Sequence, residues 1–208
     1  MVITIQTNDK KMLTIGDSIT NGFNGEVDLH KNYPFFLKKL LNLKEIDNHG
    51  VNAGMISGFS ERDLTYQVKI TDFSSYDIVS IAYGTNDYSH SDCFLNDIKR
   101  TLQNNLKLIK QNNPNLIIIG ILPINRFDNH TFIDQQLNSV DYSYHELLDE
   151  ISKVYQSFNI PVLNWRKVAP NFLTVDNYQE KLNDQRLHPN QSTYYEMAQI
   201  IANFIKGI

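Results

Sequence analysis

Short apolar runs alternate with stretches of helical periodicity along this chain of 208 residues, and that alternation limits the folds open to it. A regular succession of β-branched runs and helices is typical of a parallel sheet with helices on both faces. We therefore predict an α/β fold of three layers, α/β/α, with a flavodoxin-like five-stranded parallel sheet in a single domain, 1–208. The expected strands are 12–15, 46–51, 78–83, 116–122 and 160–163, of which 46–51 has the weakest pattern.

Apolar residues recur at intervals of three and four in several stretches, which is the spacing of one face of a helix. Ser60, with Asp63 three residues later, resembles a capping box at the start of one such stretch. Two polar segments without clear periodicity are candidates for loops that contact a substrate, because such loops usually carry specificity. The expected helices are 33–41, 60–70, 95–109, 137–151 and 194–205, and the two polar segments are 123–136 and 166–183.

Composition excludes several classes of function. A formal net charge of −4 provides no basic field for nucleic acid or for an anionic membrane. Cys93 is the single cysteine, so neither an internal disulfide nor a Cys-rich zinc site is expected, and no metal or cofactor is predicted. The longest apolar run, 116–122, is too short to cross a bilayer, and the N-terminal stretch lacks the apolar core of a signal peptide. A cytoplasmic location is the simplest expectation, and the oligomeric state is left open.

The stretch 13–21 reads LTIGDSITN and carries the first candidate for chemistry. An apolar run stops at Gly16, and the residues after Ser18 lead towards a helix, so Ser18 follows directly after a predicted strand. Open α/β sheets bind their ligands at this edge. A glycine permits a tight turn, and the first amides of a helix face a developing negative charge. Ser18 is therefore a candidate nucleophile, although Asp17 and Ser18 alone would more often be helix caps.

Two later stretches favour the nucleophile. The sequence YGTND, 83–87, follows another apolar run, and DQRLHPN, 184–190, lies near the C-terminus. Ser, Gly, Asn and His in this order resemble the SGNH hydrolases, also called the GDSL esterase/lipase family. The resemblance spans nearly the whole chain, from Gly16 to Ala198, and it implies a serine-dependent ester hydrolase.

A serine hydroxyl needs a base, and the base needs a group that fixes its tautomer. His188 is the best candidate among the six histidines because Pro189 follows it and lets a helix begin. In the family the aspartate usually stands three residues before the histidine, whereas Asp184 stands four before it and Gln185 occupies the usual place. Either one residue bulges out or Gln185 orients the ring without charge. Asp184 is preferred, since a neutral amide would do little for the imidazolium.

Several hydrogen-bond donors must already point at the position where the oxyanion forms. The resemblance implies the backbone N–H groups of Ser18 and of a glycine, together with the side chain of Asn86. The glycine is ambiguous, because the stretch 52–58 has one residue more than the usual spacing and both Gly54 and Gly58 are available. Gly58 is preferred because the stretch 58–64 matches the family's register from this glycine into a helix. Asp17 and Gly54 are then assigned to substrate binding.

The sequence thus predicts a serine esterase that acts on a small acyl ester through an acyl-enzyme, without metal or cofactor. Carboxylesterase, acetylesterase and lysophospholipase-like activities all fit the resemblance, and an acyltransferase using the same triad is an alternative. A non-catalytic ligand-binding domain on the same fold is a second alternative, because a fold does not fix function. A nucleotide-binding module is disfavoured by the lack of a Gly-rich loop with Lys.

Overall fold

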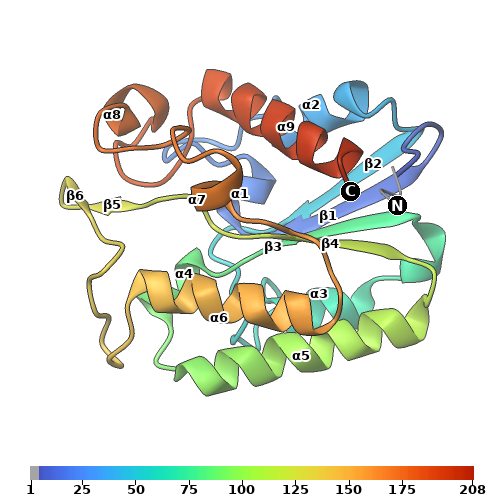
Figure 1. Cartoon of the computed structure of the whole chain (residues 1–208), viewed down its shortest axis with the longest axis horizontal. Coiled ribbons are helices and arrows are strands. Elements are labelled where there is room, and N and C mark those ends of the chain that lie inside the picture. The colour runs from blue at the N-terminus through green and yellow to red at the C-terminus, as the bar shows by residue number, and fades with distance from the viewer. Residues whose placement is uncertain (1–4) are drawn as a thin grey trace.

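The computed structural model describes residues 5–208 and contains one five-stranded parallel sheet (Figure 1). The strand order is β2-β1-β3-β4-β7, and every pairing in this sheet is parallel. This arrangement confirms the predicted fold class. The strands are β1 (Lys11–Gly16), β2 (Glu45–Gly50), β3 (Ile78–Ala82), β4 (Ile117–Ile121) and β7 (Val162–Leu163).

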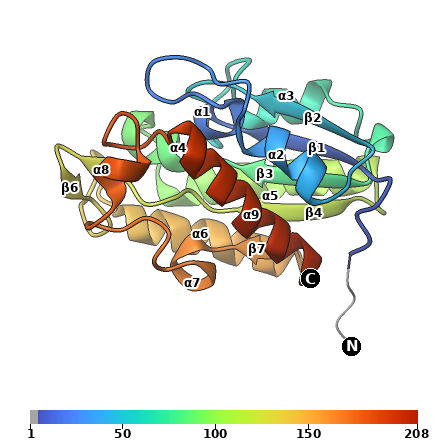
Figure 2. The same ribbon diagram turned by 90° about the horizontal axis from the view of Figure 1, so that it is seen from above.

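Helices cover both faces of the sheet. Figure 1 shows α2 (Tyr33–Leu40) and α9 (Gln191–Lys206) on one side, and Figure 2 shows them lying across the strands. The other face carries α3 (Leu64–Ile70), α5 (Leu95–Asn112) and α6 (Tyr144–Ser157). The short elements are α1 (Ser18–Asn21), a 3-10 helix (Phe73–Ser75), α4 (Thr85–His90), β5 (Phe127–Asp128), β6 (Thr131–Phe132), α7 (Trp165–Val168) and α8 (Tyr178–Lys181).

The central strands are apolar on both sides, which explains their continuous runs in the sequence. In β1, Met12 packs with the α2 and α9 side, whereas Leu13 and Ile15 pack with α3, α5 and α6. All three are fully buried. Strand β2 pairs only with β1 and is half-buried along most of its length, so its sequence has little apolar signal.

Two expected helix starts are wrong. The helix expected over 137–151 begins at Tyr144, because Ser143 and Glu146 form a capping box there, and Leu137 lies outside it and is exposed. The capping box expected at Ser60 does not form, since α3 begins after Asp63. The Asp63 carboxylate accepts hydrogen bonds from the backbone N–H and hydroxyl of Ser60, at 2.8 and 2.6 Å, and so closes a loop before the helix.

The strand order reverses its direction at β1. The chain passes from β1 to β2 on one side and then to β3 on the other, so the segments that leave β1 and β3 diverge at the carboxyl edge. Ligands of open α/β sheets bind at such a switch point. No helix within residues 5–208 is long and apolar enough to cross a membrane. The cytoplasmic location and the assignment of 1–208 to a single domain stay predictions.

Candidate active site

Ser18 begins the short helix α1 directly beyond β1. The Asp17 carboxylate caps this helix by accepting the Ile19 N–H at 2.9 Å, and the helix ends at Gly22, whose φ of 105° suits glycine. A side chain at Gly16 would lie 2.1 Å from the Thr20 hydroxyl, so glycine allows α1 to fold back against the strand. As the first helical N–H, that of Ser18 has no partner within the helix.

The Ser18 hydroxyl, the His188 imidazole and the Asp184 carboxylate lie in one hydrogen-bonded line. Ser18 Oγ lies 3.0 Å from His188 Nε2, and His188 Nδ1 lies 2.6 Å from Asp184 Oδ2. With Nδ1 protonated, His188 donates to Asp184 and leaves Nε2 free to accept from the serine hydroxyl. This geometry matches the nucleophile, base and orienting acid of a serine hydrolase.

Asp184 is held by the segment that carries His188. Its Oδ1 accepts three backbone N–H groups, those of Arg186, Leu187 and His188, at 3.0, 2.8 and 2.9 Å. Burial alone would raise the pKa of Asp184, but the hydrogen bonds from His188 and from the backbone outweigh it and lower the pKa to about 2. The Asp184 carboxylate is therefore charged at any pH at which His188 could act as the base.

The extra residue between acid and base bulges out of the way. Gln185 adopts the left-handed conformation with a φ of 52°, which turns the chain so that Asp184 and His188 face each other. The loop after α1 packs on the same two residues. The ring of Phe23 meets the His188 ring edge to face at 4.9 Å, and a side chain at Gly25 would lie 2.7 Å from the Asp184 Cβ.

Asn86 lies in the first turn of α4, directly beyond β3, and is buried. Its Nδ2 donates to the carbonyl of Gly54 at 3.0 Å, which fixes the amide and leaves its second N–H available. The Gly54 N–H itself donates to the Val51 carbonyl at 3.1 Å. Gly54 therefore orients Asn86 through its carbonyl, while its own N–H is already engaged.

Two buried carboxylates hold the loop that contains Gly58. Asp87 accepts the Ile56 N–H at 2.8 Å, and it also accepts the N–H and hydroxyl of Ser57 at 2.8 and 2.7 Å. Asp63 accepts the Met55 N–H at 2.9 Å in addition to its bonds with Ser60. A side chain at Gly58 would lie 2.1 Å from the Asp63 carboxylate. Within residues 5–208, the Gly58 N–H donates to no protein acceptor.

The structure brings Ser18, His188 and Asp184 together. Asp17 and Gly54, which the sequence assigned to substrate binding, form hydrogen bonds with other residues of the protein. Asp17 is 3% exposed, and burial raises its pKa to about 7. Asp87 was not singled out from the sequence, although it follows Asn86, because nothing in the pattern shows what its carboxylate contacts. Within the described chain, no group of three or more His, Cys, Asp or Glu side chains could hold a metal ion. The roles of all these residues in chemistry stay predictions.

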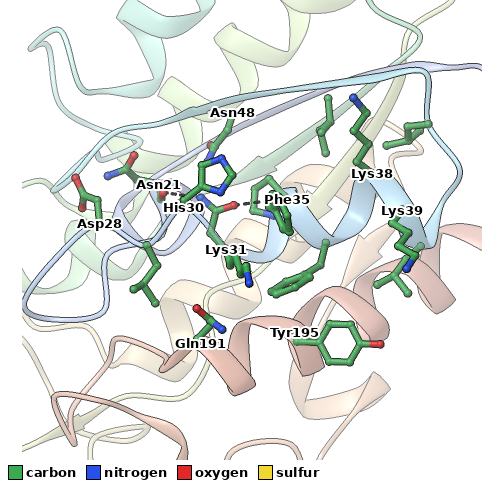
Figure 3. A pocket seen from close by; sticks show the side chains of 17 residues that line it. Asn21, Asp28, His30, Lys31, Phe35, Lys38, Lys39, Asn48, Gln191 and Tyr195 are labelled. Atoms are coloured by element: carbon green, nitrogen blue, oxygen red, sulfur yellow. Dashed lines mark hydrogen bonds between the residues drawn. The ribbon is translucent and has the colours of Figure 1, made fainter.

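A large groove lies on another surface. It has a volume of about 1520 Å³ and runs along α2 beside β2 and α9. Figure 3 shows Phe35 and Tyr195 along it, with Lys31, Lys38 and Lys39 around them. Neither Ser18 nor His188 lines this groove, so its size does not make it the catalytic site.

A three-layer α/β/α fold with serine, histidine and aspartate aligned at the carboxyl edge of its sheet defines a hydrolase of the SGNH class. A family model described as the GDSL-like lipase/acylhydrolase family matches residues 14–195, and the chain belongs to this family. Comparison with curated protein sequences gave no match.

Solved structures show the same fold at low sequence identity. The lipase/acylhydrolase from Enterococcus faecalis is 21% identical with a TM-score of 0.70, over 95% of this chain and 96% of that one. A protein from Lactobacillus plantarum is 19% identical with a TM-score of 0.76, over 95% and 96%. The inhibitor-bound aryl esterase of M. smegmatis is 14% identical with a TM-score of 0.70, over 93% and 97%.

Proposed function

We propose that this chain is a serine esterase that hydrolyses small acyl esters through an acyl-enzyme. The observation that carries the proposal is the line from Ser18 Oγ to His188 Nε2, 3.0 Å, and from His188 Nδ1 to Asp184 Oδ2, 2.6 Å. Family membership supports ester chemistry in general, and this line supports Ser18 as its nucleophile.

In the proposed reaction, Ser18 Oγ attacks the ester carbonyl carbon while His188 Nε2 takes the hydroxyl proton. The tetrahedral intermediate collapses, and His188 returns that proton to the departing alkoxide. Water then attacks the acyl-enzyme while His188 takes its proton, and His188 passes that proton to Ser18 Oγ as the bond between Ser18 and the acyl group breaks and the acid leaves. The charged Asp184 stabilises the imidazolium in both halves, because its pKa is about 2.

The oxyanion is proposed to accept hydrogen bonds from Ser18 N–H, Gly58 N–H and Asn86 Nδ2. Gly58 is favoured over Gly54 because the Gly54 N–H already donates to Val51, whereas that of Gly58 donates to no acceptor in the described chain. The clamp of Asp87 on Ile56 and Ser57 holds the backbone immediately before Gly58. Preorganised donors of this kind usually provide a large part of catalysis.

The test is hydrolysis of p-nitrophenyl esters of increasing acyl length by wild type and Ser18→Ala, with Ser74→Ala as the control. Ser74 is an exposed serine of the 3-10 helix, outside the candidate site. We expect Ser18→Ala to lose turnover by more than a thousandfold, and Ser74→Ala to retain it. The acyl length preferred by wild type would then measure the acyl pocket.

Labelling with a serine-directed phosphonate provides a second readout, and mass mapping should locate the adduct on Ser18. If no ester is hydrolysed and Ser18 is not labelled, the proposal is wrong and the chain is a binding domain on this fold. If added alcohols capture the acyl group faster than water does, the same acyl-enzyme serves an acyltransferase.

A further inference from the structure

Two arginines share one carboxylate beside the candidate active site. Arg126, on the loop that follows β4, donates from Nε to Asp128 Oδ2 at 2.8 Å, and Arg186 donates from Nε to Asp128 Oδ1 at 2.6 Å. Two guanidinium charges against one carboxylate leave a net positive charge in this cluster, which we call the arginine pair. Arg126 is only 2% exposed, so its charge lies inside the protein.

The arginine pair connects the two halves of the proposed site. Arg126 Nη1 donates to the Thr85 carbonyl at 3.1 Å, one residue before Asn86. Arg186, two residues before His188, donates its backbone N–H to Asp184 Oδ1 at 3.0 Å. The Phe127 N–H also donates to the Arg186 carbonyl at 2.9 Å, so the two arginine segments are joined through their backbones.

The arginine pair retains unused donors. Within residues 5–208, neither Arg126 Nη2 nor the two Nη atoms of Arg186 donate a hydrogen bond to a protein acceptor. A guanidinium that is nearly buried and only partly bonded is costly, and an anion on its free side would satisfy it. The planar fork of arginine suits the paired oxygens of a carboxylate or phosphate.

His90 indicates where the positive field reaches. It stands four residues after Asn86 in α4, so the two side chains lie on the same face of the helix, about 6 Å apart at Cβ. The pKa of His90 is lowered by burial and then by the charges of Arg126, Arg186 and Arg62, against an opposing effect of Asp128. His90, one turn after Asn86, therefore lies within the field of the arginine pair.

We infer that Arg126 and Arg186 bind an anionic group of the ester substrate, a carboxylate or a phosphate, beside the candidate active site. This inference rests on the proposed esterase function and narrows its substrate class. The anion is carried either by the acyl part or by the alcohol part, and matched substrates distinguish the two.

The test compares pairs of esters that differ in one anionic group. For the acyl side, p-nitrophenyl hemisuccinate is paired with the neutral p-nitrophenyl levulinate, and for the alcohol side, 1-acetylglycerol 3-phosphate is paired with 1-acetylglycerol. At neutral pH we expect wild type to prefer the anionic ester of one pair by at least tenfold in kcat/KM. Arg186→Gln should lower that preference roughly tenfold through a higher KM for the anionic ester.

Three further variants test the interpretation. Arg186→Lys should restore part of the preference, and Arg100→Gln should keep all of it, because the Arg100 side chain is exposed on α5 and pairs with Asp97. Arg126→Gln, with its fold checked by circular dichroism, should also lower the preference, and it should lower kcat for the neutral ester as well, because it loses the bond to the Thr85 carbonyl beside Asn86. Equal rates for both members of both pairs would overturn the inference, as would a preference that neither Gln variant reduces.

Failure of the subsite can be separated from failure of the esterase. Hydrolysis of the neutral esters without any anion preference would overturn only the subsite. If no ester reacts, calorimetric titration of wild type and Arg186→Gln tests the subsite alone, with the anionic monomethyl succinate against the neutral methyl levulinate, and with glycerol 3-phosphate against glycerol. Tighter binding of one anion that is lost in Arg186→Gln would support the subsite, and equal binding within both pairs would overturn it.

Discussion

The proposed acid–base half of the site lies on one short segment, 184–188, whereas the oxyanion half is assembled from separate parts of the chain. Asp184 bonds to its own segment through three backbone N–H groups and His188. The loop around Gly58 is instead held by Asp87 from α4 and by Asp63 before α3. The first half is fixed by local sequence, and the second depends on tertiary packing.

The largest effect is expected from breaking the self-contained half. Asp184→Asn should lower kcat roughly ten-thousandfold, because an amide at this place fails to hold His188 with Nδ1 protonated and does not stabilise the imidazolium. Steady-state hydrolysis of a p-nitrophenyl ester measures this loss. Asp176→Asn, a change of an exposed acid outside the candidate triad, is the matched control. Equal rates for Asp184→Asn and wild type would remove Asp184 from the mechanism.

A direct oxyanion donor comes next. Asn86→Ala should cost about a hundred- to a thousandfold in kcat, the usual effect of losing one such donor, with a smaller change in KM. The same ester assay measures it, and the phosphonate adduct on Ser18 should still form, more slowly. An unchanged rate would sink the assignment of Asn86 to the oxyanion hole.

Asp87→Asn tests whether tertiary contacts hold the oxyanion half of the site in place. The amide would turn an N–H₂ towards either the Ile56 N–H or the Ser57 donors, so one clamp bond is lost and the Gly58 N–H shifts. We expect a tenfold to hundredfold loss in kcat, since small displacements at a reacting centre are costly. A thermal melt run beside the kinetics separates misplacement from unfolding. Full activity in a stable variant would show that Asp87 does not position Gly58.

The same contrast explains what the sequence allowed us to predict. Ser18, Asn86 and His188 each directly follow a strand or precede a helix, and the resemblance of their motifs to the SGNH hydrolases grouped them. Asp184 was also found because it lies near His188 in sequence. The choice between Gly54 and Gly58 could not be made from spacing, because it depends on which N–H is already bonded. Likewise, Arg126 lies in a polar segment whose sequence does not indicate burial.

A smaller effect follows from the acid that caps α1. Burial raises the folded-state pKa of Asp17 from 3.8 to about 7, so the folded protein holds this proton more tightly than the unfolded chain does. The associated stability is fully present below about pH 4 and is lost as pH rises through about 7. Urea unfolding of wild type between these limits should therefore show a decline in stability that is smaller in Asp17→Asn, in which the similar contribution of Asp87 remains, because burial raises the pKa of Asp87 to about 6. Parallel pH dependences in the two proteins would contradict this shift.

The smallest effect is expected at the bulge that lets Asp184 reach His188. Gln185→Ala should leave kcat within about twofold, because the Asp184 carboxylate already bonds His188 Nδ1 at 2.6 Å and no task remains for the Gln185 amide. Gln185→Gly should also remain active and should raise the free energy of unfolding by up to about 1 kcal/mol, since glycine adopts a φ of 52° without steric strain. Ester kinetics and urea titration measure the two effects. A large loss of kcat in Gln185→Ala would instead make the neutral amide the group that orients His188.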